Sequence, residues 1–350
     1  MAANILIVGQ GLAGTLLSYS LLQRGVQHRV VDQLQPHAAS RVAAGLMNPL
    51  AGRALAPAAH WDRFMPSAEG MYRALETLLD RSFYHQRNFL TVFSSEKDRA
   101  RWQAAAEDPA RQSFLDASFL DAGKPAGTHS PWGAAVVRGG AQLDVGDLLD
   151  AYRSYLQDRN MLVDRSFHHP DLSPIEETWA WEDGLYRAVV FCEGHQAANN
   201  PWFGHLPWRP NLGERLLLRI PAGSWSGILR RQGLLAPAPN GLYWLGSANQ
   251  WDPSTTSPTE KGQTHLAGIA TGLLDTAWTA VDHAAAIRPT MQDRHPVVGP
   301  HPDWPGLWIL NGLGTKGSLW CPWHADRLAA VLAGSEEPSN LDARTLPARF

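Results

Sequence analysis

The sequence predicts an α/β fold: a parallel sheet with helices, into which a mixed or antiparallel sheet is inserted. Three observations support this prediction. The chain opens with an apolar run at residues 4–8, a glycine turn and a leucine-rich helical stretch, the pattern of a buried parallel strand and its covering helix. A strand and glycine turn recur at residues 307–317. Between them lie alternating apolar and polar runs bounded by turn residues, which are typical of antiparallel strands.

Composition limits the class of protein. With 350 residues, 44% hydrophobic and 18% charged, the chain suits one elaborate globular domain or two closely packed ones. A net charge of −3 gives no basic surface, so nucleic acid is not an expected partner. No secretory signal precedes the first strand and no run of 18 apolar residues occurs, so we expect a soluble, cytoplasmic protein without a membrane span.

No metal site is predicted. The two cysteines, Cys192 and Cys321, lie in apolar surroundings and fit buried, inert thiols better than a disulfide framework or a metal motif. The 14 histidines form no HExxH-like array.

The amino-terminal unit has the pattern of a dinucleotide-binding βαβ motif. The strand at residues 4–8 runs directly into Gly9-Gln-Gly11-Leu12-Ala13-Gly14. A helix over Thr15 to Arg24 follows, with Gly25 as its C-cap, and then a second strand over residues 28–32.

Each glycine of this motif has a mechanical role. Gly9 permits the tight turn from strand to helix, Gly11 lets a pyrophosphate approach the backbone, and Gly14 lets the helix pack on the sheet. The free N–H groups at the helix N-terminus favour phosphate. Asp32 ends the second strand 21 residues after Gly11, where an acid meets the adenosine ribose, and this argues against NADP. The motif alone does not decide whether the dinucleotide is FAD or NAD. The alternative to a dinucleotide-binding motif is an ordinary glycine turn without a ligand.

Beyond Asp32 the chain resembles the family of D-amino-acid oxidase, glycine oxidase and sarcosine oxidase. The resemblance begins at residues 39–49, where Ser40 and Arg41 precede small residues. In that family such a segment runs along the pyrophosphate and ribityl chain of FAD. The resemblance implies that Arg41 neutralises phosphate and that Ala43, Ala44 and Gly45 let the backbone pass close under the flavin ring. The cofactor-binding residues that it implies in this segment are Ser40, Arg41, Ala44, Gly45 and Leu46.

Further segments match the family in order. Residues 139–144 precede a helix over 145–159, and residues 188–194 form a strand that ends at Gly194, where the family's chain passes the cofactor again. Gly213-Glu214 resembles the turn at which the substrate part resumes, ahead of a strand over 215–220.

The carboxyl end carries the strongest resemblance. Residues 288–299 and the strand 307–310 lead into a glycine loop and an apolar helix from about Pro322 to Leu332. In the family this loop lies near the pyrimidine end of the flavin, which favours FAD over NAD. The cofactor-binding residues that it implies here are Asn311, Gly312, Gly314, Thr315, Lys316 and Gly317.

The resemblance also implies a domain division. Residues 1–62, 139–205 and 286–350 are assigned to a Rossmann-like FAD-binding domain, and residues 63–138 and 206–285 to the substrate-binding domain. Where sarcosine oxidases carry a cysteine that bonds to the flavin, this chain has Ala286, so we expect non-covalent FAD.

Two residues are predicted to act on the substrate side. A guanidinium fork suits a carboxylate, so Arg288 is the candidate for holding a substrate carboxylate, with an ion pair to Asp293 as the structural alternative. Lys316 is a second anion contact or a stabiliser of the reduced flavin, with a solvent-facing turn lysine as its alternative. Several of the fifteen tryptophans, Trp244 and Trp251 among them, fall on this side, as aromatic walls or as simple core.

The predicted activity is oxidation of the C–N bond of an amino acid or amine by hydride transfer to flavin N5, giving an imine. Oxygen or another electron acceptor then reoxidises the flavin. One alternative is the FAD-dependent side-chain oxidase of wobble uridine in tRNA, whose carboxyl end is similar, although the chain lacks basic character. The other is a flavoprotein without turnover.

Overall fold

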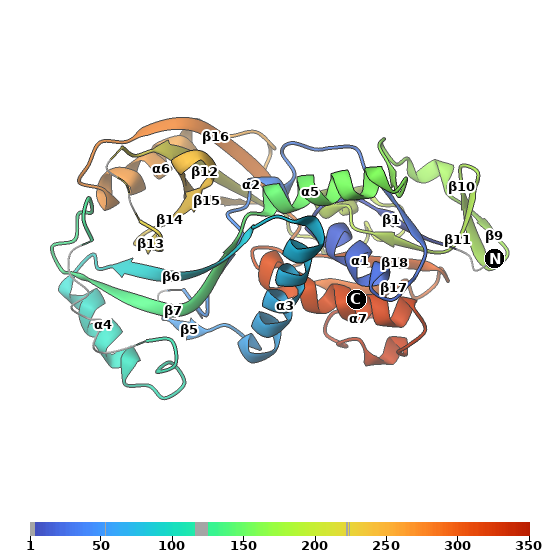
Figure 1. Cartoon of the computed structure of the whole chain (residues 1–350), viewed down its shortest axis with the longest axis horizontal. Coiled ribbons are helices and arrows are strands. Elements are labelled where there is room, and N and C mark those ends of the chain that lie inside the picture. Colours follow the sequence, from blue (N-terminus) through green and yellow to red (C-terminus); the bar gives the residue numbers. More distant parts are fainter. Residues whose placement is uncertain (1–3, 53, 116–124, 222, 224) are drawn as a thin grey trace.

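Two large sheets lie side by side and confirm the predicted α/β class (Figure 1). The computed structural model describes residues 4–52, 54–115, 125–221, 223 and 225–350. The helices α1, α5 and α7 lie beside the first sheet, while α4 and α6 lie beside the second.

The first sheet has the order β17-β18-β11-β1-β2-β8, in which β18 to β8 are parallel and β17 is antiparallel to β18. Strand β10 is attached to β11, and β9 to β10, both in antiparallel pairs. Its strands are β1 (Asn4–Val8), β2 (His28–Val31), β8 (Leu162–Val163), β9 (Ser173–Ile175), β10 (Thr178–Trp181), β11 (Gly184–Phe191), β17 (Val297–Pro300) and β18 (Leu307–Asn311). Strand β1 pairs in parallel with β2 and β11, and β11 pairs in parallel with β18. Ile5, Leu6 and Ile7 are fully buried, as their unbroken apolar run predicts for a strand covered on both faces.

The second sheet is mixed but mainly antiparallel, as predicted, in the order β16-β12-β15-β14-β13-β6-β7-β3. Its strands are β3 (Leu46–Met47), β6 (Tyr84–Val92), β7 (Ala134–Leu143), β12 (Asn211–Arg219), β13 (Ile228–Arg230), β14 (Leu234–Ala238), β15 (Leu242–Trp251) and β16 (Thr279–Arg288). Only the β13–β6 pair is parallel among the described pairs of this sheet. A separate two-stranded ribbon joins β4 (Leu50–Ala51) to β5 (Ala56–Pro57).

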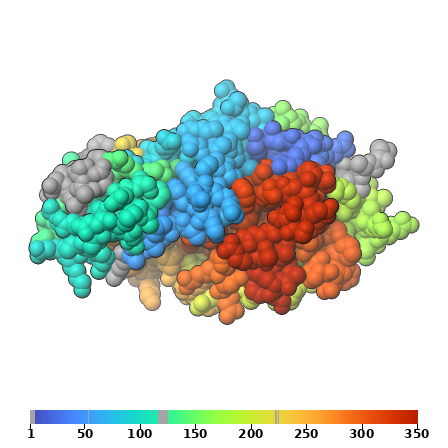
Figure 2. Space-filling view, turned by 90° about the horizontal axis from the view of Figure 1, so that it is seen from below, coloured from blue at the N-terminus to red at the C-terminus, as the bar shows by residue number. Residues whose placement is uncertain are grey.

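The helices pack the two sheets into one structure. They are α1 (Leu12–Leu22), α2 (Ala39–Val42), α3 (Trp61–Leu79), α4 (Glu96–Ala106), α5 (Val145–Asp158), α6 (Glu260–Leu273) and α7 (Gly317–Leu332). Helix α7 contacts both α1 and α3, and Figure 2 shows the α3 and α7 segments side by side on one face. The main core cluster contains apolar side chains of all three helices, such as Leu16, Tyr72 and Leu328.

Helix α7 begins five residues earlier than the predicted start near Pro322. A proline inside a helix has no N–H to donate to the carbonyl four residues before it. Here that carbonyl, on Ser318, instead accepts a hydrogen bond of 2.7 Å from the hydroxyl of Tyr72 in α3. The partner from α3 explains why the helix continues through the proline, and it brings the helix N-terminus into the glycine loop.

The predicted turn at Gly213-Glu214 is wrong, because both residues lie inside β12. Gly213 pairs with Asn249 of β15 and Ala286 of β16. By contrast, residues 239–241, with the turn signature Pro-Asn-Gly, do separate β14 from β15, and Asn240 and Gly241 have φ of 60° and 68°.

His324 is a buried histidine, and we expect it to make the fold sensitive to acid. The side chain is buried in α7, and burial lowers the pKa of His324 to about 4; the charge of Asp342 opposes this shift, while the charges of Arg344 and Arg63 add to it. In the unfolded chain His324 therefore takes up a proton below about pH 6.5, whereas in the folded chain it does so only near pH 4. We predict that stability falls as pH drops between these values, by up to about 3 kcal/mol for this group alone.

Thermal unfolding of a His324→Leu variant tests this prediction. The loss of melting temperature between pH 7.5 and pH 5 should be smaller in this variant than in the unaltered protein. His265→Leu, at an exposed position of α6, is the matched control and should leave the loss unchanged. An identical acid response in all three proteins would contradict the prediction.

Both cysteines are buried, as predicted, and burial raises the pKa of the Cys192 and Cys321 thiols. Within the described residues, no group of three or more His, Cys, Asp or Glu side chains has a metal-binding arrangement. In that same part of the chain, no helix has both the length and the apolar surface that crossing a bilayer requires.

Candidate functional site

Four of the predicted cofactor-binding segments meet at one edge of the first sheet. Parallel strands β1, β2, β11 and β18 end at that edge, with Val8 paired to both Val31 and Phe191. The segments that follow them carry the residues singled out in the sequence: the turn at 9–14, Asp32, Gly194 and the loop at 311–317. The carboxyl edge of a parallel sheet is where such folds bind ligands.

The three glycines of the first turn differ in their surroundings. Gly9 has a φ of 101°, and a β-carbon there would lie 2.6 Å from the Cys192 carbonyl oxygen. A β-carbon at Gly14 would overlap the carbonyl oxygen of Gly9, so this position fixes how closely α1 approaches the strand. At Gly11 the nearest atom to such a β-carbon is Ser40 Oγ, at 3.5 Å, which leaves room for a ligand.

Two helix N-termini lie side by side at this edge. A β-carbon at Gly317, the first residue of α7, would be 3.6 Å from Leu12 Cδ2, at the first residue of α1. Neither helix has an acid in its first turn or a side-chain N-cap. The Leu12 N–H donates to Ser40 Oγ at 3.2 Å. The two N-termini, neither of which is capped by the side chain of its own N-cap residue, together fit an anionic group such as a pyrophosphate.

Asp32 is held by partners that the sequence did not reveal. Its carboxylate accepts the Gln10 N–H at 2.9 Å and an Arg153 N–H at 2.8 Å. Burial raises the pKa of Asp32, while the bonds from Gln10 and Arg153 lower it. Arg153 also pairs with Asp164 at 2.6 Å. Arg153 comes from α5, 121 residues along the chain from Asp32, so no local spacing pointed to it.

Residues 40–46 connect the two sheets. Arg41 forms an ion pair with Asp150 of α5 at 2.7 Å, so its proposed contact with phosphate remains a prediction. Gly45 has a φ of 65°, and its carbonyl accepts the Leu143 N–H at 3.0 Å. Leu46 pairs with Gln142 in the second sheet, and Gln142 Nε2 lies 3.4 Å from the Ala44 carbonyl.

Trp244 of β15 also anchors this segment. Its indole N–H donates to the Val42 carbonyl at 2.9 Å. The second sheet is therefore bonded directly to the segment predicted to pass under the flavin.

The carboxyl-terminal loop contacts the end of β11. Asn311 is buried, and its amide Nδ2 donates to the Gly194 carbonyl at 2.9 Å, while its Oδ1 accepts the Gly312 N–H at 2.9 Å. Gly312 and Gly314 have φ of 71° and 53°, a backbone conformation that favours glycine. Thr315 is exposed at the tip of the loop.

Arg288 ends β16 next to this loop. The following residue, Pro289, accepts the Gly314 N–H at 3.0 Å. The Arg288 Nη1 donates to two neutral amides, Asn211 Oδ1 and Asn249 Oδ1, each at 2.6 Å. Burial lowers the pKa of Arg288 to about 10, so the group is still a cation at neutral pH.

The alternative reading of Arg288 as a partner of Asp293 is wrong. Asp293 instead forms an ion pair with Arg349, at 3.0 Å. Among the described residues no carboxylate pairs with Arg288, which leaves its charge uncompensated in the absence of an anionic ligand.

Lys316 lies at the N-cap of α7 and is half-buried rather than fully solvent-facing. Its ammonium nitrogen lies 4.8 Å from the centre of the Trp320 ring. Burial lowers the pKa of Lys316. The side chain therefore places a positive charge beside the glycine loop.

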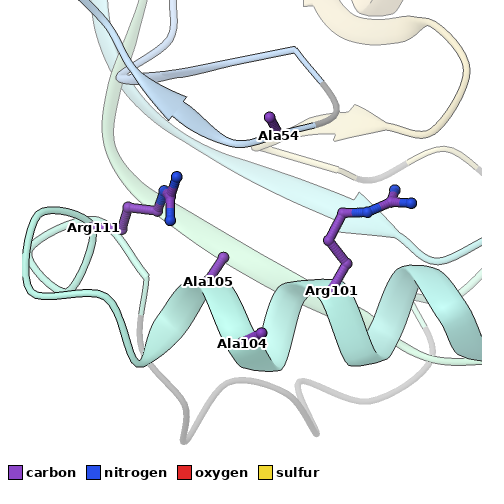
Figure 3. Close-up of a pocket in the computed structure, with 5 residues that line it drawn as sticks. All are labelled: Ala54, Arg101, Ala104, Ala105 and Arg111. Carbon is purple, nitrogen blue, oxygen red and sulfur yellow. The ribbon is translucent and has the colours of Figure 1, made fainter.

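A cavity of about 490 Å³ elsewhere in the molecule contains none of the predicted site residues (Figure 3). It lies between α4 and Ala54, and its two arginines already have acidic partners: Arg101 pairs with Asp98 and Arg111 with Asp108. The lining of this cavity therefore offers no candidate for the predicted chemistry.

Comparisons with known proteins agree with this geometry. The family described as "FAD dependent oxidoreductase" (DAO) matches residues 4–331. The chain is 24% identical to glycine oxidase of Pseudomonas aeruginosa, covering 96% of each protein. It is 28% identical to a bifunctional protein of tRNA 5-methylaminomethyl-2-thiouridine biosynthesis, MnmC, from a Caulobacter species; the match covers 99% of this chain but only 57% of that protein.

The fold has solved counterparts as well. The crystal structure of glycine oxidase from Geobacillus kaustophilus superposes with a TM-score of 0.79 at 19% identity, over 99% of this chain and 98% of the other. Because the family match extends over residues 4–331 of the 350, this chain belongs to the FAD-dependent oxidoreductase family of D-amino-acid oxidase.

Proposed function

We propose that the protein oxidises the C–N bond of an amino acid or a carboxylate-bearing amine and releases an imine. The observation that carries this proposal is Arg288: a cation with two neutral amide partners, one residue from a peptide bonded to the glycine loop. A substrate carboxylate is the ligand that such a fork binds best. The amine beside that carboxylate would then face the flavin.

The residues at the sheet edge suit FAD. The N-termini of α1 and α7, with Ser40, would hold the pyrophosphate, and Asp32 would accept from the ribose hydroxyls. The loop with Asn311 and Gly314 would lie along the flavin ring. Bound FAD supplies the acceptor for a hydride from the carbon beside nitrogen.

The chain's own task is orientation and charge. Arg288 would fix the carboxylate so that the neighbouring C–H points at the ring, and proximity of this kind accounts for much of an enzyme's rate. The nitrogen loses its proton to water as the C=N bond forms, and water then hydrolyses the imine. Lys316 would favour the negative charge that the reduced ring acquires. Oxygen or another acceptor would take the electrons.

We also propose that FAD is bound non-covalently. Ala286 is buried in β16 opposite Gly213, and both cysteines are buried with raised pKa values, so neither thiol suits bonding to the flavin. Acid precipitation of the yellow protein should release all of the flavin into the supernatant. Flavin that stays with the precipitate would contradict this.

Anaerobic flavin reduction tests the proposed function. The holoenzyme is mixed with glycine, sarcosine, D-amino acids, L-proline and larger secondary amines, and bleaching of the flavin absorption is followed. We expect reduction by at least one carboxylate-bearing amine, and reduction only at much higher concentrations by the same amine without its carboxylate. No reduction by any member would favour a flavoprotein without turnover, and colourless protein that cannot be reconstituted with FAD would end the proposal.

One surface favours a second candidate, oxidation of a side chain on tRNA. Trp251 is 40% exposed, and the guanidinium carbons of Arg209 and Arg294 lie 4.8 and 5.9 Å from its ring centre. An exposed aromatic ring between two arginines suits a nucleobase and its phosphates. The similarity to the tRNA-modifying protein points the same way, although the net charge of −3 does not.

A mobility-shift assay with tRNA at low salt separates the two candidates. Binding that weakens in a Trp251→Ala variant would favour the tRNA substrate. No shift at micromolar protein would leave the free amino acid or amine as the substrate.

A further inference from the structure

The register of three strands gathers a set of small and amide side chains around Arg288. Arg288 of β16 lies directly opposite Asn211 of β12. Two residues along β12, Gly213 lies opposite Asn249 of β15. Side chains directly opposite each other, or two residues apart along one strand, project from the same face of a sheet. Arg288, Asn211, Gly213 and Asn249 therefore share one face.

Gly213 gives the guanidinium its place. A β-carbon at Gly213 would overlap both Nη2 and Cζ of Arg288. The Arg288 side chain thus lies flat across the bare backbone of Gly213. The backbone of Gly213 has no left-handed φ, so the conformation of the strand itself does not require glycine there. Space for Arg288 is what requires it.

Within the part of the chain that the structure describes, the two amides bind one nitrogen of the Arg288 guanidinium and leave its other two nitrogens free. Both Asn211 Oδ1 and Asn249 Oδ1 accept from the same nitrogen, Nη1, and so use its two hydrogens. Among the described residues, Nε and Nη2 have no hydrogen-bond partner. These two nitrogens form the edge that binds a carboxylate through two parallel bonds. Because amides carry no charge, the full charge of Arg288 stays available.

Asn211 offers a further donor. Its side chain is only 3% exposed, and its Nδ2 is buried without an acceptor among the described residues. A buried donor without a partner is costly, so this position calls for an acceptor that the protein itself does not supply. An anion bound to the open edge of Arg288 has oxygen atoms to provide one.

We propose that Asn211, Gly213 and Asn249, together with Arg288, form a binding site for a single carboxylate, called the receptor below. In this site the two amides and the glycine fix the orientation of the Arg288 guanidinium. Gly213 and Asn249 are positioning residues, while Asn211 aims Arg288 through Oδ1 and donates to the carboxylate through Nδ2. This inference rests on the proposed function and assigns residues to its specificity for carboxylates. An acidic residue in place of either amide would supply an internal anion and compete with the substrate.

Binding of sodium acetate to the holoenzyme tests the receptor. The dissociation constant is measured from the change in flavin absorption and again by calorimetry, so that no turnover is needed. In Gly213→Ala, the new methyl group displaces the guanidinium, and we expect acetate to bind about tenfold or more weaker. Gly268→Ala, at a helical glycine of α6 with no atom within 4 Å of the added carbon, is the matched control.

A second pair of variants keeps the test valid if Gly213→Ala fails to fold. Asn249→Asp places a carboxylate on the Arg288 Nη1, and we again expect a loss of about tenfold or more in acetate binding. Gln250→Glu adds the same charge at the next residue of β15, whose side chain projects from the opposite face, and should change binding much less. FAD content should be equal in all variants.

The outcomes separate the receptor from the proposed function. Weak acetate binding by Arg288→Leu, Gly213→Ala and Asn249→Asp, with tight binding by both controls, is the expected result. If Arg288→Leu loses acetate while the other two variants bind it normally, the receptor is overturned and the proposed role of Arg288 stands. If Arg288→Leu binds acetate normally, both the receptor and the proposed role of Arg288 are overturned.

Discussion

Replacing Arg288 by leucine is expected to raise the KM for amino-acid substrates by about 100-fold while the protein keeps its FAD, because a paired charge-assisted hydrogen bond contributes roughly 2–3 kcal/mol. The expectation follows from the surroundings of the guanidinium. Its contacts with Asn211 and Asn249 are to neutral amides, so the substrate would supply the only opposing charge. Leucine removes that interaction and fills part of the same space.

The size of the loss should depend on the carboxylate. An amine without a carboxylate gains nothing from Arg288, so its KM should change little. Arg288→Lys keeps the charge but not the two parallel donors, so we expect its KM for amino acids to lie between those of the unaltered protein and Arg288→Leu. Steady-state kinetics with one substrate and its decarboxylated analogue measure both effects.

Arg219→Leu is the matched control, since Arg219 is an exposed arginine at the far end of β12. It should leave KM unchanged for both compounds. An unaltered KM for the amino acid in Arg288→Leu, with flavin retained, would remove Arg288 from the substrate site.

The parts of the site that were predictable from sequence are those that local chemistry determines. Gly9, Gly11 and Gly14 follow a strand at fixed spacing, and Asp32 ends the next strand, so each is recognisable without knowing what lies across the fold. The same holds for the loop after β18. The backbone geometry of a turn depends on the residues of that turn, and a glycine in the sequence indicates where such a turn lies.

The parts that were missed depend on partners far along the chain. Asn211 meets Arg288 across 77 residues, and Arg153 meets Asp32 across 121. Gly213-Glu214 was predicted as a turn from the family resemblance, and a glycine inside a strand usually weakens that strand. Its reason is the guanidinium that crosses it from β16, and no pattern within β12 contains that information.

The start of α7 was misplaced for the same kind of reason. Proline ordinarily marks the first turn of a helix, which placed the predicted start at Pro322. This rule does not hold here, because the Tyr72 hydroxyl donates a hydrogen bond to the Ser318 carbonyl. Tyr72 lies in another helix, 246 residues away along the chain. Local propensity was overridden by one tertiary hydrogen bond.

Two glycines of the first turn should fail in different ways when each is replaced by alanine. At Gly14 the added carbon would overlap the Gly9 carbonyl oxygen, and both atoms belong to the backbone, so α1 must move away from β1. We expect the apoprotein to lose about 3 kcal/mol of unfolding free energy and FAD binding to be lost with it. Gly70→Ala, at a helical glycine of α3 with no atom within 4 Å of the added carbon, controls for the substitution itself and should not destabilise.

Gly11→Ala should instead leave the apoprotein stable. Its φ of −77° and ψ of −167° suit alanine, and the new methyl group meets only Ser40 Oγ, at 3.5 Å. If this face receives a pyrophosphate, the methyl group holds it away from the helix N-terminus, and FAD affinity should fall by about tenfold or more. Denaturant unfolding and FAD titration of the two variants separate these effects. Equal FAD affinity in Gly11→Ala and the unaltered protein would mean that the open face of Gly11 does not meet the phosphates, because nothing in the fold itself reserves that space.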